Sequence, residues 1–407
     1  MQTPAEINIE DYSYDLPDHR IARFPLEERD ASKLLVYRQG QITSSTFWQI
    51  GDFLPTNSLL VFNDTRVIHA RLRFVLPSGA QIEILCLEPL QPAEYQQNLS
   101  ATGAVTWKCL IGNNRKWKSG VLDATLALSQ KEMPLHIERM GRSENAFEVR
   151  FQWPDTTISF GELLAEGGII PLPPYLKRES TPDDIHRYQT IYAHYEGSVA
   201  APTAGLHFTD RVFENLEAKN IDRTFLTLHV GAGTFKPVST PTLGEHHMHS
   251  ETVAIKKSTL ETIYQAIVEE RPVITVGTTA SRVLESIYWH GVQVIKGKRE
   301  AIMEIPQWLP YENRSWPTPQ ESLNAVLQQL TEQNLETLEG STQLLIAPSY
   351  TYRLIDGLIT NFHQPKSTLM LLVAALVGDD WHKIYDYALT EDFRFLSYGD
   401  SSLLLRR

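Results

Sequence analysis

The feature that most limits the fold is a change in the spacing of apolar residues along the chain. From about residue 156 onward, short apolar runs alternate with longer segments whose apolar residues recur three and four positions apart. Val273–Val276 is such a run, and a helical pattern over Ala280–Trp289 follows it. Strands that alternate with helices predict an α/β layer, in which parallel strands are favoured.

Further elements follow from the same patterns and from helix-capping residues. Thr209-Asp210 has the character of a helix start, and Ser367–Gly378 reads as a strongly apolar helix. The other expected elements are strands at Lys33–Tyr37, Leu59–Phe62, Arg223–Val230 and Leu344–Ala347, and a helix at Ser258–Glu270.

Residues from about 70 to 155 have a different character. Short alternating segments such as Gln81–Cys86 are separated by turn residues, for example Gly112-Asn113-Asn114. Regular short strands between turns predict a small β-barrel or sandwich. The stretch from 297 to 341 differs again, because it is acidic and interrupted by prolines in its first half, and we expect a surface insertion there.

Charge and cysteine content narrow the classes of function. The 37 basic and 49 acidic residues give a net charge of −12, which argues against wholesale coating of nucleic acid but not against a local basic groove. Two cysteines exclude a disulfide framework or a four-cysteine zinc site. No signal peptide is evident, and Leu369–Val377 is too short for a membrane helix of about 20 residues. We therefore expect a soluble cytoplasmic protein.

Two segments pair a buried strand with a glycine-containing turn. Thr227–Phe235 contains His229 at a strand end, before a Gly-Ala-Gly turn that does not continue as a dinucleotide fingerprint. His229 is either a site residue or a hydrogen-bonded histidine of the turn. In Val276–Leu284, a strand, a glycine and Thr278-Thr279 precede a helix, which suits an anion at the helix N-terminus or simple capping by threonine.

Three other segments hold polar groups that suit a site. Glu196–Thr209 is a run of small residues that ends near His207 and suits either a flat ligand or a buried structural loop. Asp356–Leu369 places Thr360, Asn361 and His363 between a strand and a helix. His246–Glu251 has three histidines and a glutamate, but not the spacing of a zinc protease.

Taken together, these segments resemble one family, the S-adenosylmethionine:tRNA ribosyltransferase-isomerases of queuosine biosynthesis. The matching motifs occur in order along nearly the whole chain: Tyr14–Pro17, Arg29–Ser32, Phe62–Arg66, Pro171–Tyr175, Arg187–Tyr192, Ser198–Thr209, Leu228–Phe235, Met248–Glu251, Val276–Thr279, Thr360–His363, Ser367–Leu369 and Phe395–Asp400. The resemblance implies a discontinuous, sandwich-like α/β catalytic domain of residues 1–70 plus 156–407, with an inserted small β-barrel domain at 71–155.

The resemblance also implies a reaction. The ribosyl part of S-adenosylmethionine moves to 7-aminomethyl-7-deazaguanine at the tRNA wobble position and is isomerised, giving epoxyqueuosine, adenine and methionine. S-adenosylmethionine is consumed as a substrate, and no cofactor or metal is expected. The partner is the anticodon arm of tRNA, and we expect a monomer with no membrane association.

The chemistry of a sulfonium substrate indicates which residues to seek. A general base can remove an acidified C5′ proton, and adenine needs proton donation as it leaves. The candidate catalytic residues are His229, which is the first choice, and His207, His363 and Asp64. The candidate substrate-binding residues are Tyr175, Thr203, Gly231, Gly233, Thr278, Thr279, Arg282 and Asn361. The candidate phosphate contacts for tRNA are Lys108, Arg115, Lys116 and Lys118, although a solvated turn is the more common explanation for such a cluster.

Two alternatives remain at this point. A metal-dependent hydrolase would use the His246–Glu251 cluster. A non-catalytic RNA-binding module would need only basic and aromatic groups, and it leaves the ordered histidines and glycine turns unexplained.

Overall fold

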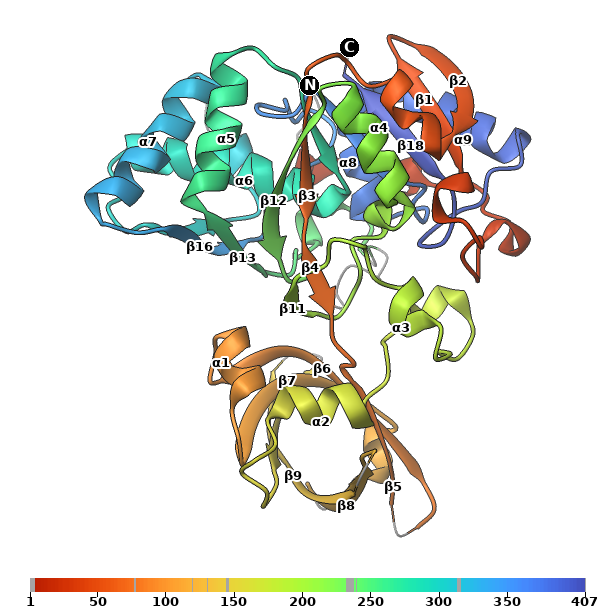
Figure 1. Ribbon diagram of the computed structural model, residues 1–407, viewed down its shortest axis with the longest axis vertical. Coiled ribbons are helices and arrows are strands. Elements are labelled where there is room, and N and C mark those ends of the chain that lie inside the picture. The colour runs from red at the N-terminus through yellow and green to blue at the C-terminus, as the bar shows by residue number, and fades with distance from the viewer. Residues whose placement is uncertain are drawn as a thin grey trace.

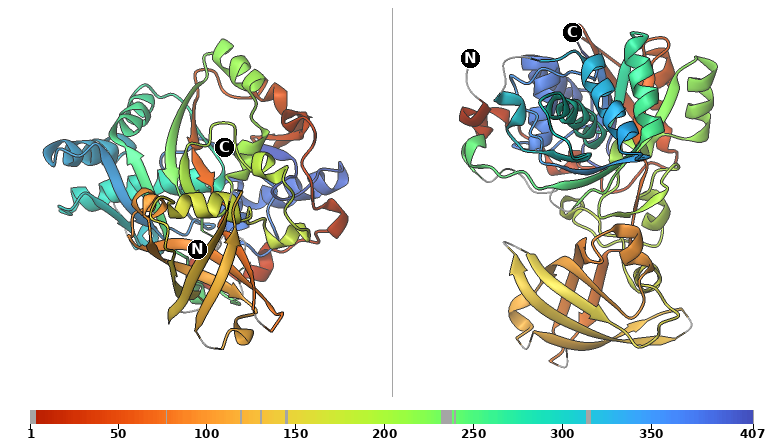
Figure 2. Two further views of the ribbon diagram at one scale, coloured as in Figure 1. Left: turned by 60° about the horizontal axis from the view of Figure 1, so that its bottom comes forward. Right: turned by 90° about the vertical axis from the view of Figure 1, so that its left-hand side faces the viewer.

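The computed structural model describes residues 4–76, 78–118, 120–129, 131–143, 146–231, 238, 240–312 and 316–406. A large mixed sheet with helices forms one part, and a barrel-like sheet forms the other (Figure 1). The right-hand view of Figure 2 shows the barrel-like sheet standing clear of the helices of the large sheet. The structure is therefore a mixed α/β fold with a separate antiparallel β layer.

Within the described residues, the large sheet has ten strands in the order β15-β16-β13-β12-β3-β14-β17-β18-β1-β2. Their bounds are β1 Lys33–Arg38, β2 Gln41–Thr46, β3 Leu59–Asn63, β12 Asp222–Leu228, β13 Glu251–Lys256, β14 Val273–Val276, β15 Ile302–Ile305, β16 Thr337–Thr342, β17 Gly357–Asn361 and β18 Ser401–Leu405. The central neighbours β12, β3, β14 and β17 are parallel, whereas β18 is antiparallel to β17. The pairs β1–β18 and β15–β16 are also parallel, whereas β1–β2, β12–β13 and β13–β16 are antiparallel. The sheet as a whole is mixed, so the expectation of parallel strands is met in part.

Both faces of the large sheet are buried, as strand β3 illustrates. Leu59 and Val61 point into one hydrophobic core, and Leu60 and Phe62 point into another. This alternation follows from the two-residue repeat of a strand. The helices are α2 Phe160–Gly167, α3 Asp184–Arg187, α4 Asp210–Ala218, α5 Lys257–Val268, α6 Thr278–Ile295, α7 Pro319–Glu332, α8 Thr368–Val377 and α9 Trp381–Thr390, with α1 Tyr95–Ser100 beside the barrel. Among the described residues, no helix combines the length and apolar character that crossing a membrane requires.

The second sheet is antiparallel and nearly closes on itself. In the described part of the chain it has six strands in the order β5-β6-β7-β10-β9-β8, and its edge strands β5 and β8 touch. The bounds are β5 Arg71–Val75, β6 Gln81–Gln91, β7 Ala104–Gly112, β8 Val121–Ala127, β9 Glu132–Ser143 and β10 Ala146–Gln152. Buried Trp107, Ile137 and Phe151 belong to its core. Two short strands, β4 Thr65–Val67 and β11 Tyr195–Ser198, pair where the two sheets meet.

The sequence predictions for two segments are wrong. Leu344–Ala347 is buried but forms no strand, because it follows β16 as an extended segment outside the regular ladder. The stretch from 297 to 341 is not a surface insertion, since it supplies β15, α7 and β16. Its apolar residues, such as Met303 and Leu323, are buried in the main core. The prediction was wrong because it rested on the acidic average composition of the stretch and overlooked these apolar residues.

Candidate active site

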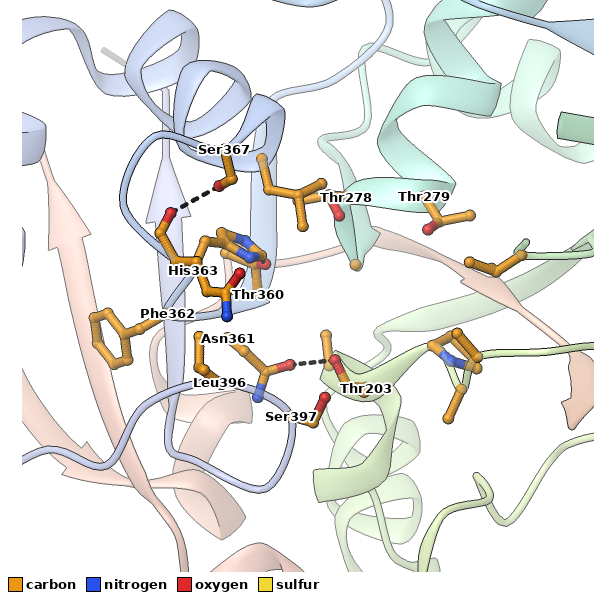
Figure 3. Close-up of a pocket in the computed structure, with 18 of the residues that line it drawn as sticks. Thr203, Thr278, Thr279, Thr360, Asn361, Phe362, His363, Ser367, Leu396 and Ser397 are labelled. Carbon is orange, nitrogen blue, oxygen red and sulfur yellow. Dashed lines mark hydrogen bonds between the residues drawn. The ribbon is translucent and has the colours of Figure 1, made fainter. Parts of the chain in front are cut away.

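A cavity lies at the carboxyl ends of β14 and β17 (Figure 3). These two strands are parallel neighbours, and ligands of open α/β sheets commonly bind at such an edge. Its walls come mainly from the loop around Thr203, the start of α6, the β17–α8 connection and the turn before β18, and Tyr175 and Val230 complete them. Of the predicted site residues, the lining includes Tyr175, Thr203, Thr278, Thr279, Asn361 and His363. The fold thus brings residues from distant motifs to one place.

The N-terminus of α6 forms one wall of this cavity. Gly277 is its N-cap residue, with φ of 91°, and no side chain of the described residues caps this end. Simple capping by Thr278 or Thr279 is therefore not what this helix uses. The positive end of the helix dipole and the threonine hydroxyls suit an anionic group such as a carboxylate.

Asn361 is the centre of a hydrogen-bonded chain behind the cavity wall. Its Oδ1 accepts a hydrogen bond from Thr203 Oγ1 at 2.9 Å, and its Nδ2 lies 3.2 Å from His207 Nε2. Because an amide nitrogen only donates, Nε2 of His207 is the acceptor. The proton then resides on Nδ1, which donates to Ser32 Oγ at 2.9 Å. Burial lowers the pKa of His207 to about 4, so the ring is neutral at pH 7.

His207 is thus held from both sides and does not line the main cavity. Ser32 reaches it because β1, which follows Ser32, runs antiparallel to β17 and so begins at the edge where β17 ends. This position makes His207 a group that orients Asn361 rather than one that touches a ligand directly.

His363 does line the cavity. Its Nε2 lies 2.9 Å from Thr360 Oγ1, and its backbone N–H donates to the hydroxyl of Tyr385 at 3.1 Å. The hydroxyl of Tyr14 donates to its carbonyl. Burial lowers the pKa of His363 to about 3, so its imidazole is neutral at pH 7.

The opposite wall includes Tyr175 and the turn before β18. The hydroxyls of Tyr175 and Ser397 lie 2.5 Å apart. Burial raises the pKa of Tyr175 to about 12, which keeps it protonated. Leu396 has φ of 68°, a left-handed conformation that is uncommon for leucine. Such strain concentrates at ligand sites in proteins.

His229 and Asp64 lie at the ends of β12 and β3, on the same edge of the sheet but outside the cavity lining. The His229 ring packs against Tyr95 with centroids 4.3 Å apart, and its Nδ1 lies 2.9 Å from Thr65 Oγ1. Burial lowers the pKa of His229 to about 4. Asp64 accepts a hydrogen bond from Thr227 at 2.7 Å, and burial raises its pKa. Gly231 follows this strand end, whereas Gly233 lies outside the described residues.

Arg282 lies one helical turn beyond Thr278 and forms a buried ion pair with Glu251. Burial lowers the pKa of Arg282 to about 10. Glu251 also lies 3.1 Å from His249 Nε2. Within the part of the chain that is described, no group of three or more His, Cys, Asp or Glu side chains could hold a metal ion. The metal-dependent alternative for the His246–Glu251 cluster thus finds no support.

The four predicted phosphate contacts lie on the barrel and do not form one group. Lys108 Nζ is 2.7 Å from Glu88 Oε1, and its two cross-strand neighbours are Glu88 and Glu148. Arg115 and Lys118 line a hollow, whereas Lys116 is exposed beside it. These four residues therefore have different surroundings and do not form the single cluster that their spacing predicted.

The set of candidate site residues omitted Ser32, Thr360, Leu396 and Ser397. The structure places Ser32 against His207, and the other three in the cavity wall. A signal was present in the sequence, because all four belong to segments singled out there, Arg29–Ser32, Asp356–Leu369 and Phe395–Asp400.

Comparison with known proteins identifies the family. Residues 9–404 match the family model described as "Queuosine biosynthesis protein". The chain therefore belongs to the queuosine biosynthesis family, which confirms the resemblance seen in its motifs. Relatives named S-adenosylmethionine:tRNA ribosyltransferase-isomerase occur in an Azoarcus species, 36% identical over 98% of both chains, and in Thermus thermophilus, 36% identical over 98% of this chain and 99% of the relative.

One solved structure, an S-adenosylmethionine tRNA ribosyltransferase from Thermotoga maritima, is 26% identical to this chain. The alignment covers 97% of this chain and all of the other, with a TM-score of 0.46.

Proposed function

We propose that this enzyme transfers and isomerises the ribosyl part of S-adenosylmethionine onto 7-aminomethyl-7-deazaguanine at the tRNA wobble position. The products are epoxyqueuosine-tRNA, adenine and methionine. The observation that carries the proposal is the family match over residues 9–404, together with relatives of that name that are 36% identical along 98% of the chain. S-adenosylmethionine is consumed as a substrate, with no metal or other cofactor.

The cavity at the ends of β14 and β17 is the proposed binding site for S-adenosylmethionine. Thr278 and Thr279 at the N-terminus of α6 suit the carboxylate of the methionine part. Thr203, Asn361 and Tyr175 supply hydrogen-bonding groups on the facing walls. Arg282 is not part of the cavity lining. Its proposed role is to neutralise the charge of Glu251 beside the first turn of α6, without touching the substrate.

His363 is the proposed general base. It is the imidazole among the candidates that both lines the cavity and is neutral at pH 7. The C5′ protons beside a sulfonium are acidic enough for such a base. His207 orients Asn361. His229, the first choice from the sequence, and Asp64 lie at the neighbouring strand ends outside the cavity lining, and their proposed role is contact with the tRNA base rather than proton removal.

The large sheet and its helices, residues 1–70 plus 156–407, form the proposed sandwich-like catalytic domain. Residues 71–155 form the proposed inserted barrel domain, which contacts tRNA. We propose a monomer as the active form.

The test is to incubate the enzyme with S-adenosylmethionine and tRNA that carries the deazaguanine precursor. Adenine release and the mass gain of the tRNA are measured, and adenine no higher than without enzyme would refute the proposal. His363→Gln should lose at least about a hundredfold in turnover if it is the base. His136→Gln, which changes an exposed barrel histidine, is the matched control. Activity abolished by a chelator would favour a hydrolase instead, and tRNA binding without turnover would favour an RNA-binding module.

A further inference from the structure

A basic hollow lies at the end of the barrel that faces away from the large sheet. Strand β5 leaves the junction between the two sheets and runs to that end (Figure 1). Strand β7 runs in the same direction as β5, because both are antiparallel to β6, and β9 runs in the same direction as β7, because both are antiparallel to β10. The hollow of about 510 Å³ is formed where β7 and β9 end, by Arg115, Lys118, Arg142 and neighbouring residues. With nine residues in β7 at about 3.3 Å each, it lies roughly 30 Å from the near end of the barrel.

Two of the four cations that line this hollow, Arg139 and Arg142, lie over aromatic rings. The guanidinium of Arg139 lies 5.6 Å from the centroid of the Trp117 ring and 5.4 Å from that of Phe147. Arg142 lies 5.8 Å from the centroid of Phe147. Both rings are buried and belong to the lining of the hollow, so they support the guanidinium groups at its wall.

The charge of the hollow is unusual in a chain with a net charge of −12. Among the described residues that line it, four are basic and none is acidic. No described carboxylate forms an ion pair with Arg115, Lys118 or Arg139. Lys108, elsewhere on the barrel, shows the contrast, because it is flanked by two glutamates.

We propose that this hollow binds backbone phosphates of the substrate tRNA, at a part of the molecule distant from the wobble nucleotide. The proposal rests on the proposed function, since a wobble base in the cavity leaves the rest of the tRNA to reach along the barrel. Arginine forks match phosphate oxygens, and backbone contacts position a nucleic acid without reading its sequence. The buried rings of Trp117 and Phe147 are not available for base stacking, which favours phosphate as the ligand group.

The test is tRNA binding without S-adenosylmethionine, measured over a range of salt concentrations. In Arg115→Gln/Lys118→Gln, both substituted side chains are exposed, so the fold should persist, as an unchanged unfolding midpoint would verify. We expect the Kd for tRNA to rise about tenfold. The slope of log K against the logarithm of the salt concentration should become shallower by nearly two, because two phosphate contacts are lost. The KM for tRNA should rise, while kcat at saturating tRNA and the KM for S-adenosylmethionine stay unchanged.

Two further variants control for charge. Lys131→Gln/Arg150→Gln removes the same charge from other barrel positions, where Lys131 pairs with Asp155 and Arg150 faces Glu138 across the strands, and it should bind as wild type does. Arg115→Lys/Lys118→Arg keeps the charge and should retain affinity. If Arg115→Gln/Lys118→Gln keeps the affinity and the salt dependence of the wild type, the hollow does not bind tRNA, and the proposed function is unaffected. A wild-type enzyme that fails to bind tRNA would overturn the proposed function together with it.

Discussion

The imidazole of His207 and the side-chain amide of Asn361 meet at 3.2 Å behind the cavity wall. Asn361 uses its other amide atom to hold Thr203, which faces the cavity. The histidine is fixed in turn by Ser32. The orientation of two cavity residues therefore depends on a ring that the ligand need not touch.

Removing that ring should affect both stability and turnover. In His207→Ala, the buried amide of Asn361 and the hydroxyl of Ser32 lose their partner, which costs about 1–3 kcal/mol beyond the lost packing. Urea unfolding measures the stability, and adenine release should show a lower kcat. His19→Ala, which alters an exposed histidine, should match wild type in both. A His207→Ala enzyme with wild-type stability and wild-type kcat would contradict the proposal that His207 orients Asn361 and Thr203.

The buried histidines predict that acid destabilises the fold well before carboxylates titrate fully. His207 and His363 have pKa values lowered by burial, to about 4 and about 3, while an unfolded histidine titrates near 6.5. Below pH 6.5 the unfolded chain therefore binds more protons than the folded chain, and the free energy of unfolding falls as pH falls. Each histidine should account for roughly 3 kcal/mol of that loss by pH 4.

Denaturant unfolding between pH 7.5 and 4.5 measures this dependence. His363→Gln removes one of the two groups and should flatten the curve over that range. An equal slope in wild type and in this variant would show that His363 does not titrate as its burial indicates.

The buried pair of Arg282 and Glu251 gives a prediction about coupling. Arg282→Met leaves the carboxylate of Glu251 buried without its main partner, at a cost of about 3–5 kcal/mol. Adding Glu251→Gln to that variant should recover part of the loss, because the uncompensated charge is gone. The free energies of unfolding of both single variants and of the double variant, measured in urea, form a double-mutant cycle. If the two single losses simply add up in the double variant, the two side chains do not interact.

Gly277 connects backbone conformation to the cavity. Its φ of 91° disfavours any side chain, so Gly277→Ala should lose about 1–2 kcal/mol of stability and move Thr278 and Thr279. Gly297 also has a positive φ, of 104°, but lies beyond the other end of α6. Gly297→Ala should therefore lose stability to a similar extent and keep its turnover. Equal turnover losses in the two variants would mean that the helix start does not position a ligand.

Local patterns in the sequence were enough for several elements. Thr209 caps α4 and Ser367 caps α8, as their positions before apolar periodic segments predicted, and Gly378 ends α8. Leu344–Ala347 failed because an apolar run identifies burial but not hydrogen-bonded pairing, which depends on neighbouring strands.

The site could be predicted only as a set of segments. Asn361 and His207 are 154 positions apart, and Ser32 and His207 are 175 apart, so their contacts depend on the order of strands in the sheet. The motifs marked His207, His229 and His363 alike. Only the fold separates the histidine that lines the cavity from one that lies behind it and one that lies beside it.

The pairing of β1 with β18 has a consequence for synthesis of the protein. The ribosome makes β18 after every other strand of the large sheet, so β1 must wait beside β2 until its other neighbour has emerged. The barrel strands, from Arg71 to Gln152, are contiguous and can assemble much earlier. During translation the nascent chain would then carry a finished barrel, while the cavity at the ends of β14 and β17 is completed only after Leu396 and Ser397 have emerged.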